Sequence, residues 1–360
     1  QSNDVELVSG TARFEGPNRL SVLQPDGATR WLSAASILIA AGSDSAMPGF
    51  LPRDKRVMDS RAFLDLTELP KNLLILGGGV IGCEFACMAA ALGANVTVVE
   101  MLEDIVMVLD RDVRRVLRKR MEALGVTLLT GAPLMDIAVK NGTVSGTYKD
   151  QTVTGDLLLV AVGRRPNTAA LDLARAGVKI DERGTIPVDA QGRTNVASIF
   201  AVGDLVTGSI QLAHAATQQG VAAVEAAAGL KSHVEKLCPS CIFTSPEIGL
   251  AGLTEAKAQQ LGLTVKTATF PFSALGKAMA AGETDGFVKW ICDAASGQVL
   301  GAQAVGAHAT ELIAEAALAI RNELTVDEVG RTIHSHPTMS EAWMEAAHAF
   351  HNACIHLPKR

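Results

Sequence analysis

A glycine-rich segment near residue 80 constrains the fold of this chain more than any other feature. An apolar strand pattern over residues 73–76 runs directly into Gly77-Gly78-Gly79-Val80-Ile81-Gly82, and a helical pattern rich in small residues follows to Leu92. A second apolar run at residues 96–99 completes a βαβ unit. In this loop Gly77 permits a tight turn, Gly79 lets a pyrophosphate approach the backbone, and Gly82 lets the helix pack on the strand. The helix N-terminus would offer free N–H groups to the phosphates, so the segment predicts a dinucleotide-binding domain.

Glu100 indicates which dinucleotide this domain binds. It stands at the end of the second strand, 23 residues after Gly77, where a carboxylate is expected to meet the adenosine ribose hydroxyls. A carboxylate there repels a 2′-phosphate, and no arginine follows in Met101-Leu102. We therefore expect NAD rather than NADP.

A second motif, near the C-terminus, carries acid–base chemistry. His336 and Glu341 are five residues apart in His334-Ser335-His336-Pro337-Thr338-Met339-Ser340-Glu341, across a Pro-Thr turn that leads into a helix. The turn can bring the carboxylate back to the imidazole, and a histidine held by a carboxylate is an oriented base. A core histidine is the alternative interpretation. A His334-x-His336 metal pair is another, although no third ligand stands at a suitable spacing.

Length and composition limit the class of protein. With 360 residues, 48% apolar and 19% charged, the chain is expected to fold into two or three domains. The net charge of −6 and the absence of a long basic run argue against nucleic acid and anionic membrane surfaces. We find no apolar stretch of membrane-spanning length and no signal-peptide pattern at the start, which favours the cytoplasm. The six cysteines are too sparse for a disulfide scaffold.

Other segments are less specific and serve mainly to outline the fold. Three apolar strand patterns end in glycine turns, at Ala41-Gly42-Ser43, at Gly163 and at Gly203-Asp204. Each alone is typical of any strand-to-loop turn. An alanine-rich helix is expected from about residue 211 to 228, and a hairpin turn at Asn141-Gly142. After residue 238 we expect strands near 264–271, 286–293 and 298–305, and helices near 254–261, near 309–322 and from about Ser340.

Taken together and in order, these motifs resemble those of the pyridine nucleotide–disulfide oxidoreductase family. The resemblance rests on the glycine loop, Ala-Val-Gly-Arg at 161–164, Ala-Val-Gly-Asp at 201–204 and the His-Pro-Thr-x-Ser-Glu stretch, and it covers essentially the whole chain. Val98-Val99-Glu100-Met101, Ala268-Thr269-Phe270-Pro271 and residues 332–341 are most similar to the branch that oxidises dihydrolipoamide to lipoamide with reduction of NAD.

The resemblance implies roles for particular residues. Glu84 would lie near the nicotinamide side of a flavin, and Gly163 would close the NAD site. Asp204, preceded by Gly203, would hold the ribityl chain of FAD. The FAD contacts would be completed by Gly42, Ser43, Gln211, Leu212, Ala213 and His214.

His336 and Glu341 would deprotonate the dithiol substrate from the neighbouring subunit, so a homodimer is expected. The partner would be the lipoyl group of a 2-oxo acid dehydrogenase or glycine cleavage complex, without nucleic acid or membrane.

The fold implied is α/β in three parts. A partial FAD-binding domain would comprise residues 1–67 and 188–236, with a Rossmann-like NAD-binding domain over 68–187 inserted into it. An α+β dimerisation domain would span 237–360.

The same resemblance leads us to expect a first FAD glycine loop and a Cys-x4-Cys redox pair, and neither pattern occurs here. Cys83-x3-Cys87 lies on the NAD-domain helix and is interpreted as packing. Cys238-Pro239-Ser240-Cys241 resembles a redox C-x-x-C, but it lies outside any thioredoxin-like βαβ pattern. We therefore expect an N-terminally incomplete chain that is inactive by itself. Two alternatives stay open: a mercuric or glutathione reductase-like sibling, and a non-catalytic NAD-binding fragment.

Overall fold

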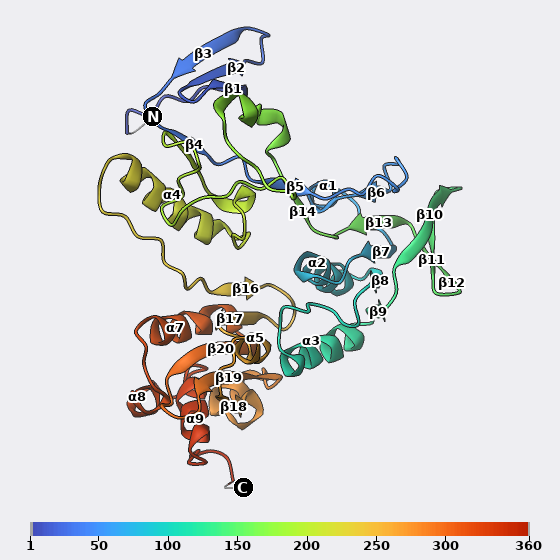
Figure 1. The fold of residues 1–360 in the computed structure, drawn as a ribbon. Helices are drawn as coiled ribbons and strands as arrows, with labels where there is room; N and C mark the ends of the chain where they lie inside the picture. Colours follow the sequence, from blue (N-terminus) through green and yellow to red (C-terminus); the bar gives the residue numbers. More distant parts are fainter. Residues whose placement is uncertain (1–2, 359–360) are drawn as a thin grey trace. The chain divides into compact units, whose positions relative to one another are not determined.

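The computed structural model describes residues 3–358 and divides into two compact units. One unit comprises residues 1–44 and 164–236, and the other comprises residues 45–163 and 237–360. Figure 1 shows the path of the chain through both. Each unit is described by itself.

The first unit is built from short strands and one long helix. Its strands β1 (Thr11–Gly16), β2 (Arg19–Leu23) and β3 (Thr29–Ser33) form an antiparallel meander. Strand β4 (Ile37–Ile39) pairs in parallel with β15 (Ile199–Ala201), and β5 (Ser43–Ser45) pairs with β14 (Arg164–Pro166). The remaining elements are helix α4 (Ala213–Ala227) and the 3-10 turns η1 (Ala169–Leu171), η2 (Leu173–Ala176) and η3 (Gly203–Leu205).

Strand β4 shows how this small unit forms its core. Ile37 and Ile39 are buried, while Leu38, which points to the opposite face, is 38% exposed. The buried pair packs with Phe14, Ile186 and Ile199 in one apolar cluster.

The second unit contains a five-stranded parallel sheet in the order β6-β13-β7-β8-β9. These strands are β6 (Val57–Met58), β13 (Leu157–Val160), β7 (Asn72–Leu76), β8 (Asn95–Glu100) and β9 (Thr127–Thr130). Helices α1 (Ser60–Leu64), α2 (Val80–Ala91) and α3 (Arg111–Ala123) accompany it. Both faces of the central strands are covered, so β13 and residues 73–76 of β7 are buried throughout, as continuous apolar runs require.

A small antiparallel meander extends this part of the unit. It consists of β10 (Leu134–Lys140), β11 (Thr143–Tyr148) and β12 (Gln151–Gly155). Asn141 and Gly142 join β10 to β11 with φ of 51° and 83°. Two consecutive left-handed residues are what a tight hairpin turn needs, so the predicted turn is confirmed.

The C-terminal part of the second unit is an antiparallel sheet covered by helices. The strand order is β16-β17-β20-β19-β18. The strands are β16 (Ser240–Ile242), β17 (Ile248–Gly252), β18 (Val265–Pro271), β19 (Gly286–Asp293) and β20 (Val299–Gly306). The helices are α5 (Glu255–Gln260), α6 (Gly276–Ala281), α7 (Ala309–Arg321), α8 (Val326–Arg331) and α9 (Glu341–Phe350), with the 3-10 turn η4 (Phe272–Ala274). The three predicted strands and three predicted helices of this region are confirmed, whereas β16, β17, α6 and α8 were not predicted.

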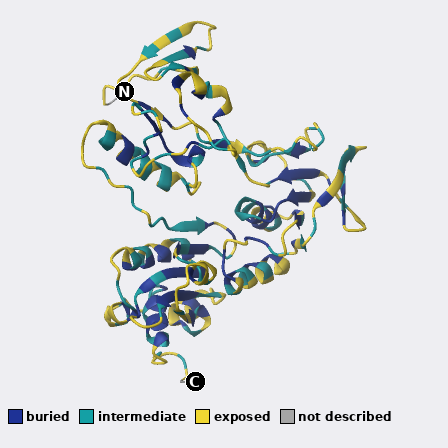
Figure 2. Cartoon of the chain, viewed as in Figure 1, coloured by how far each residue is buried: buried dark blue, intermediate teal, exposed yellow. Residues whose placement is uncertain are grey.

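Two tryptophans fill the core of this C-terminal part. Trp290 on β19 and Trp343 on α9 are fully buried, with ring centroids 4.3 Å apart. Their indole N–H groups donate to the carbonyls of Trp343 and Leu312, both at 3.0 Å, so no polar atom of either ring is buried without a partner. The arrangement fixes the start of α9, on which Glu341 stands. Figure 2 shows how strongly burial is concentrated on β19, β20 and α9.

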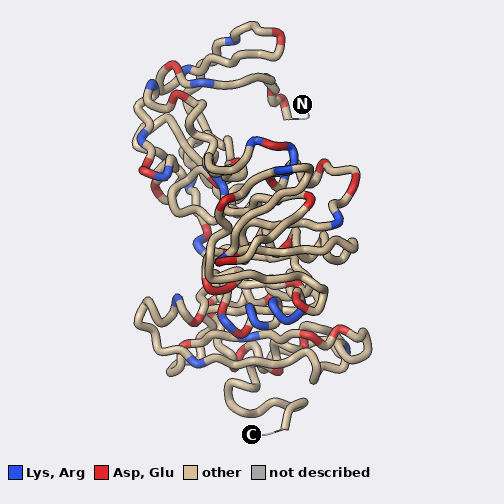
Figure 3. The backbone as a smooth tube through the Cα atoms, turned by 90° about the vertical axis from the view of Figure 1, so that its right-hand side faces the viewer, with Lys and Arg blue, Asp and Glu red and all other residues tan. Residues whose placement is uncertain are grey.

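Helix α3 has the amphipathic character that its sequence predicts. It carries Val113, Leu117 and Met121 on a buried stripe and six Lys or Arg residues elsewhere (Figure 3). Arg114 and Arg118 both pair with Asp104, at 2.6 and 2.7 Å. Among residues 3–358, every helix is too short or too polar to cross a lipid bilayer.

Candidate functional site

The predicted glycine loop connects β7 to α2, and its first and last glycines, Gly77 and Gly82, have a steric reason. Gly77 has φ of 109°, and a Cβ there would lie 2.5 Å from the Ala161 carbonyl oxygen. A Cβ on Gly82 would lie 1.9 Å from the Gly77 carbonyl oxygen. By contrast, a Cβ on Gly79 would meet nothing within 4 Å. The first and last glycines thus close the turn, while the space at Gly79 is open toward solvent.

The open space lies at the N-terminus of α2. Gly79 is the N-cap, with extended backbone and no side-chain capping bond. Val80 and Ile81 form the first turn and are only half-buried. The first N–H groups of this helix therefore border space that a phosphate group fits.

Glu100 closes the other side of the loop. Its carboxylate is buried, with Oε2 accepting from the Gly78 N–H at 2.6 Å and Oε1 accepting from the Leu102 N–H at 2.8 Å. Each carboxylate oxygen has a second acceptor site, so Glu100 can still receive the ribose hydroxyls. A Cβ on Gly78 would come within 3.0 Å of the Glu100 Cβ, which explains why the middle residue of the loop is also glycine.

Two further predicted nucleotide residues stand near the same sheet. Gly163, just past β13, has φ of 127° and open space where a Cβ would be. Glu84, on the second turn of α2, accepts a hydrogen bond from the Phe243 N–H at 2.8 Å. Burial raises the pKa of Glu84, against the opposing effect of that N–H. The residues around the loop fit an NAD-type nucleotide in shape and in charge.

The first unit brings together the predicted FAD residues Ser43 and Asp204. The Ser43 hydroxyl donates to Asp204 Oδ2 at 2.5 Å. Arg164 donates to Ser43 Oγ at 2.6 Å and lies 3.5 Å from the Asp204 carboxylate. Gly42 has φ of 66° and open space at its Cβ position, and the Gly203 N–H donates to Gln219. Asp204 is thus held in place by a hydroxyl and a guanidinium.

The stretch Gln211 to His214 leads into helix α4. Leu212 is its N-cap, with extended backbone and no side-chain capping bond, and Ala213 and His214 form the exposed first turn. This stretch therefore places an exposed helix N-terminus at the surface of the first unit.

His336 and Glu341 meet as predicted. His336 Nδ1 lies 2.8 Å from Glu341 Oε1, and Glu341 Oε2 accepts from the Thr338 N–H at 2.8 Å. The imidazole is 71% exposed, whereas the carboxylate is 8% exposed. Although burial favours the neutral acid, the bonds from Thr338 and His336 hold the pKa of Glu341 below its ordinary value. A buried anion therefore fixes an accessible imidazole.

His334 belongs to a different pair. Its Nε2 lies 2.7 Å from Glu315 of α7, and its Nδ1 lies 2.9 Å from the Thr332 carbonyl oxygen. The bond to Glu315 is the main cause that raises the pKa of His334. Because His334 and His336 are bound to separate carboxylates, the arrangement favours two imidazole–carboxylate pairs over a metal chelate.

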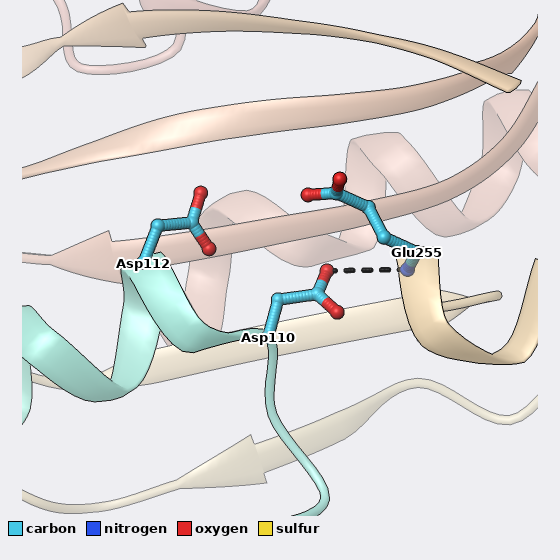
Figure 4. A group of neighbouring side chains, drawn as sticks. All are labelled: Asp110, Asp112 and Glu255. Carbon is cyan, nitrogen blue, oxygen red and sulfur yellow. Dashed lines mark hydrogen bonds between the residues drawn. The ribbon is translucent and has the colours of Figure 1, made fainter.

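One acidic cluster elsewhere in the second unit has the ligand spacing of a metal site. Figure 4 shows Asp110, just before α3, and Asp112, in its first turn, converging with Glu255 of α5. The Nζ of Lys289, on β19, lies 2.9, 2.8 and 2.8 Å from these three carboxylates, and its side chain is 1% exposed. An ammonium group occupies the position that a cation would take, so we interpret the cluster as an ion-pair network within the unit.

The cysteines carry no sign of a reactive thiolate. All six are free, and burial raises the pKa of every one, to about 12 for Cys292. Cys238 precedes β16 and Cys241 lies within it, on extended backbone. Both thiols are free and their pKa values are raised by burial, which favours a structural role over a redox pair.

Three residues have structural roles that were not predicted from the sequence. Arg164 was seen only as part of Ala-Val-Gly-Arg, yet it binds both Ser43 and Asp204. Lys289 has no local signal, since its partners are distant in sequence. Glu345, on α9, is fully buried and binds the C-terminal segment; its spacing of four from Glu341 was the only available signal.

Comparison with known proteins agrees with this geometry. Residues 1–220 match the family model for pyridine nucleotide-disulphide oxidoreductases, and residues 238–347 match the dimerisation domain of the same proteins. The chain is 41% identical to the dihydrolipoyl dehydrogenase of Chlamydia pneumoniae over 362 residues, which is 100% of this chain and 78% of that protein. It is also 41% identical to the dihydrolipoyl dehydrogenase of Haloferax volcanii, over 100% of this chain and 78% of the relative.

Solved structures show the same fold. LpdA from Mycobacterium tuberculosis aligns with a TM-score of 0.89 at 30% identity, covering 96% of this chain and 77% of that one. The HOCl-induced flavoprotein disulfide reductase RclA from Escherichia coli aligns with a TM-score of 0.88 at 28% identity, covering 95% and 79%. The glycine loop, the His–Glu pair and the matched domains agree: the chain belongs to the pyridine nucleotide-disulphide oxidoreductase family, whose members are oxidoreductases.

Proposed function

We propose that this chain forms the greater part of an enzyme that oxidises dihydrolipoyl groups to the cyclic disulfide and reduces NAD, with FAD as the intermediate carrier. The observation that carries the proposal is the contact of 2.8 Å between His336 and Glu341, with the imidazole accessible and the carboxylate buried. The similarity to dihydrolipoyl dehydrogenases along the whole chain supports this substrate class.

The His336–Glu341 pair is suited to removing a proton from a thiol. With Nδ1–H donating to Glu341, the lone pair of Nε2 is free to accept a proton. The carboxylate stabilises the imidazolium that forms and fixes the orientation of the ring. Deprotonation matters because the thiolate, not the thiol, attacks a disulfide.

The second unit would hold the nicotinamide nucleotide. Its pyrophosphate would lie in the open space at Gly79 and the N-terminus of α2, and Glu100 would bind the adenosine ribose. Glu100 would also repel a 2′-phosphate, so NAD is preferred to NADP. Gly163 would border the nucleotide, and Glu84 would lie toward its nicotinamide end.

The first unit would contribute to FAD binding. Asp204, held by Ser43 and Arg164, would bind the ribityl hydroxyls, and Gly42 would allow close approach of the cofactor. Backbone groups of residues 211–214 would border the flavin. When bound, FAD and NAD supply the electron-transfer chemistry, while the protein positions them and moves protons.

The assembly implied is a homodimer in the cytoplasm. A match to the family's dimerisation domain over residues 238–347 supports the dimer. Exposure of His336 agrees with a base that acts on a substrate bound partly by a second subunit. The relatives are named dihydrolipoyl dehydrogenases, and the partner that we propose is the lipoyl group of a 2-oxo acid dehydrogenase or glycine cleavage complex.

Steady-state kinetics of the flavin-loaded enzyme that contains these residues tests the proposal. We expect NAD-dependent oxidation of dihydrolipoamide to exceed the NADPH-dependent reduction of glutathione disulfide or mercuric ion by at least two orders of magnitude. Turnover of those alternative substrates in preference to dihydrolipoamide would contradict the proposal and favour a sibling reductase activity.

A further inference from the structure

Helix α9 carries two buried carboxylates one turn apart. Glu341 and Glu345 are four residues apart, so their side chains lie on the same face of the helix. Glu341 is 6% exposed and Glu345 is fully buried. Like charges at this spacing repel each other, and burial adds to the cost of each charge. Two adjacent buried anions therefore need compensating groups.

Glu345 has such a group in the C-terminal segment. Its Oε1 lies 2.8 Å from His356 Nδ1, and its Oε2 accepts from the backbone N–H of Ile355 at 3.0 Å and of His356 at 3.4 Å. The Cys354 thiol donates to the Glu345 carbonyl oxygen at 3.3 Å. One buried carboxylate thus fixes residues 354–356 against α9.

The two carboxylates are bound in the same way. Each receives backbone N–H groups on one oxygen and the Nδ1 side of a solvent-accessible imidazole on the other. The charge of His356 is also one of the influences that keep the pKa of Glu341 low, after burial, the Thr338 N–H and His336 itself. Because Glu345 stands one turn from Glu341 on the same face of α9, the second pair can act electrostatically on the first.

We propose that Glu345 and His356 form a second imidazole–carboxylate pair that sets the charge balance around His336 and Glu341, so that both are positioning residues for proton transfer at His336. The inference rests on the proposed function, because it assigns these residues to the same acid–base step. The hydrogen bonds that Glu345 receives from the His356 imidazole and from the backbone N–H groups of residues 355 and 356 offset its charge, one turn away from Glu341. Glu341 then remains ionised and holds the His336 ring.

Other charged groups lie around α9 and enter the balance. From α7, Glu315 faces His334, which itself senses the charge of Glu341. From α8, Asp327 pairs with His351, and from β18, Lys266 donates to the Phe350 carbonyl oxygen. The last two contacts lie at the C-terminal end of α9, two turns beyond Glu341. Of these groups, only Glu345, with its partner His356, lies one turn from Glu341 on the same face of α9.

The test is the pH dependence of kcat/KM for dihydrolipoamide in the flavin-loaded enzyme, compared for His356→Gln and Glu345→Gln. The acid limb of this profile reports the proton affinity of the free enzyme's base. His356→Gln removes the imidazole from Glu345 Oε1 and leaves that buried carboxylate less compensated, so the acid limb should move to higher pH. Removing the negative charge of Glu345 has the opposite effect. Each shift should be about 0.5–1 pH unit, the size expected when one unit charge is removed near the protein surface.

The opposite signs distinguish tuning from a purely structural role. Loosening of the C-terminal segment would lower turnover in both variants without moving the limb in opposite directions. The matched control is His351→Gln. His351 follows the last residue of α9 and also pairs with a carboxylate, that of Asp327, at 2.8 Å. This variant should leave the limb in place. Shifts in the same direction, or no shift in either variant, would overturn the inference.

A second readout separates this inference from the proposed function. The titration of the His336 imidazole can be followed by NMR in the histidine-labelled enzyme, with the signal assigned by its loss in His336→Gln. If dihydrolipoamide is not a substrate, the proposed function fails, yet the titration of His336 should still move up in His356→Gln and down in Glu345→Gln. A His336 titration midpoint that is unchanged in both variants would refute the tuning itself.

Discussion

Glu100 Oε2 accepts a hydrogen bond from the Gly78 N–H at 2.6 Å, which ties the end of β8 to the glycine loop. The same carboxylate borders the space expected to hold the adenosine ribose. One residue therefore both shapes the loop and sets the charge that a nucleotide meets there.

We expect Glu100→Gln to change nucleotide preference. Affinity for NAD should fall about tenfold or more, because hydrogen bonds to a charged acceptor contribute about 1.5–3 kcal/mol. Affinity for NADP should rise, since the repulsion of the 2′-phosphate is removed. Calorimetric titration with both nucleotides measures the ratio. Glu103→Gln, which alters an exposed carboxylate three residues away, is the control and should bind as the wild type does.

The two glycines Gly79 and Gly82 should respond differently to the same substitution. In Gly79→Ala the new methyl group would enter the open space at the start of α2, so the fold should be retained and NAD binding lost. In Gly82→Ala it would lie 1.9 Å from a backbone oxygen, so stability should fall by about 1–3 kcal/mol or more. Thermal unfolding and nucleotide titration of both variants check this. Full NAD affinity in Gly79→Ala would show that the phosphates bind elsewhere.

His336→Gln should reduce dihydrolipoamide turnover by about 10²–10⁴-fold, the usual contribution of a positioned base. Glu341→Gln should have a smaller effect, because Glu341 orients the imidazole and does not itself take the substrate proton. Stopped-flow measurement of flavin reduction by dihydrolipoamide isolates the step. Near-normal rates in His336→Gln would make the histidine a structural residue, while unchanged reduction by NADH in both variants would show that the nucleotide side is intact.

Lys289→Met should destabilise the second unit strongly. The substitution leaves Asp110, Asp112 and Glu255 converging without their cation, and breaking a buried ion pair by removing one partner costs about 3–5 kcal/mol. Chemical denaturation at neutral pH measures the loss. The deficit should shrink as the pH falls toward 4, since protonation of the carboxylates relieves their repulsion.

The control for this variant is Lys257→Met. Lys257 stands on α5 next to the same cluster but is exposed. Its replacement should change stability by less than about 0.5 kcal/mol. Equal losses in the two variants would mean that the network around Lys289 contributes nothing specific.

The sequence by itself determined the features that depend on local chain geometry. Gly77 needs positive φ, Gly82 must admit a backbone oxygen, and the strand–loop–helix order places Glu100 beside both; all of this follows from periodicity and from what glycine alone permits. The turn at Pro337 and Thr338 is equally local, so the pairing of His336 with Glu341 could be predicted from their spacing. Strands β18, β19 and β20 and the long helices of the C-terminal part were predicted for the same reason.

Only the tertiary structure decided which distant charges meet. Lys289 finds Asp110 and Asp112 more than 170 residues earlier in the chain, and Arg164 finds Ser43 across 121 residues. No periodicity encodes such contacts, because they depend on how the sheets are ordered. Strand β6 could not be predicted either, because its two residues form a strand only by pairing with β13, about a hundred residues later. The burial of Glu345 could be predicted least of all, because a glutamate on a helix is ordinarily exposed. Only the packing of α9 buries it against the C-terminal segment.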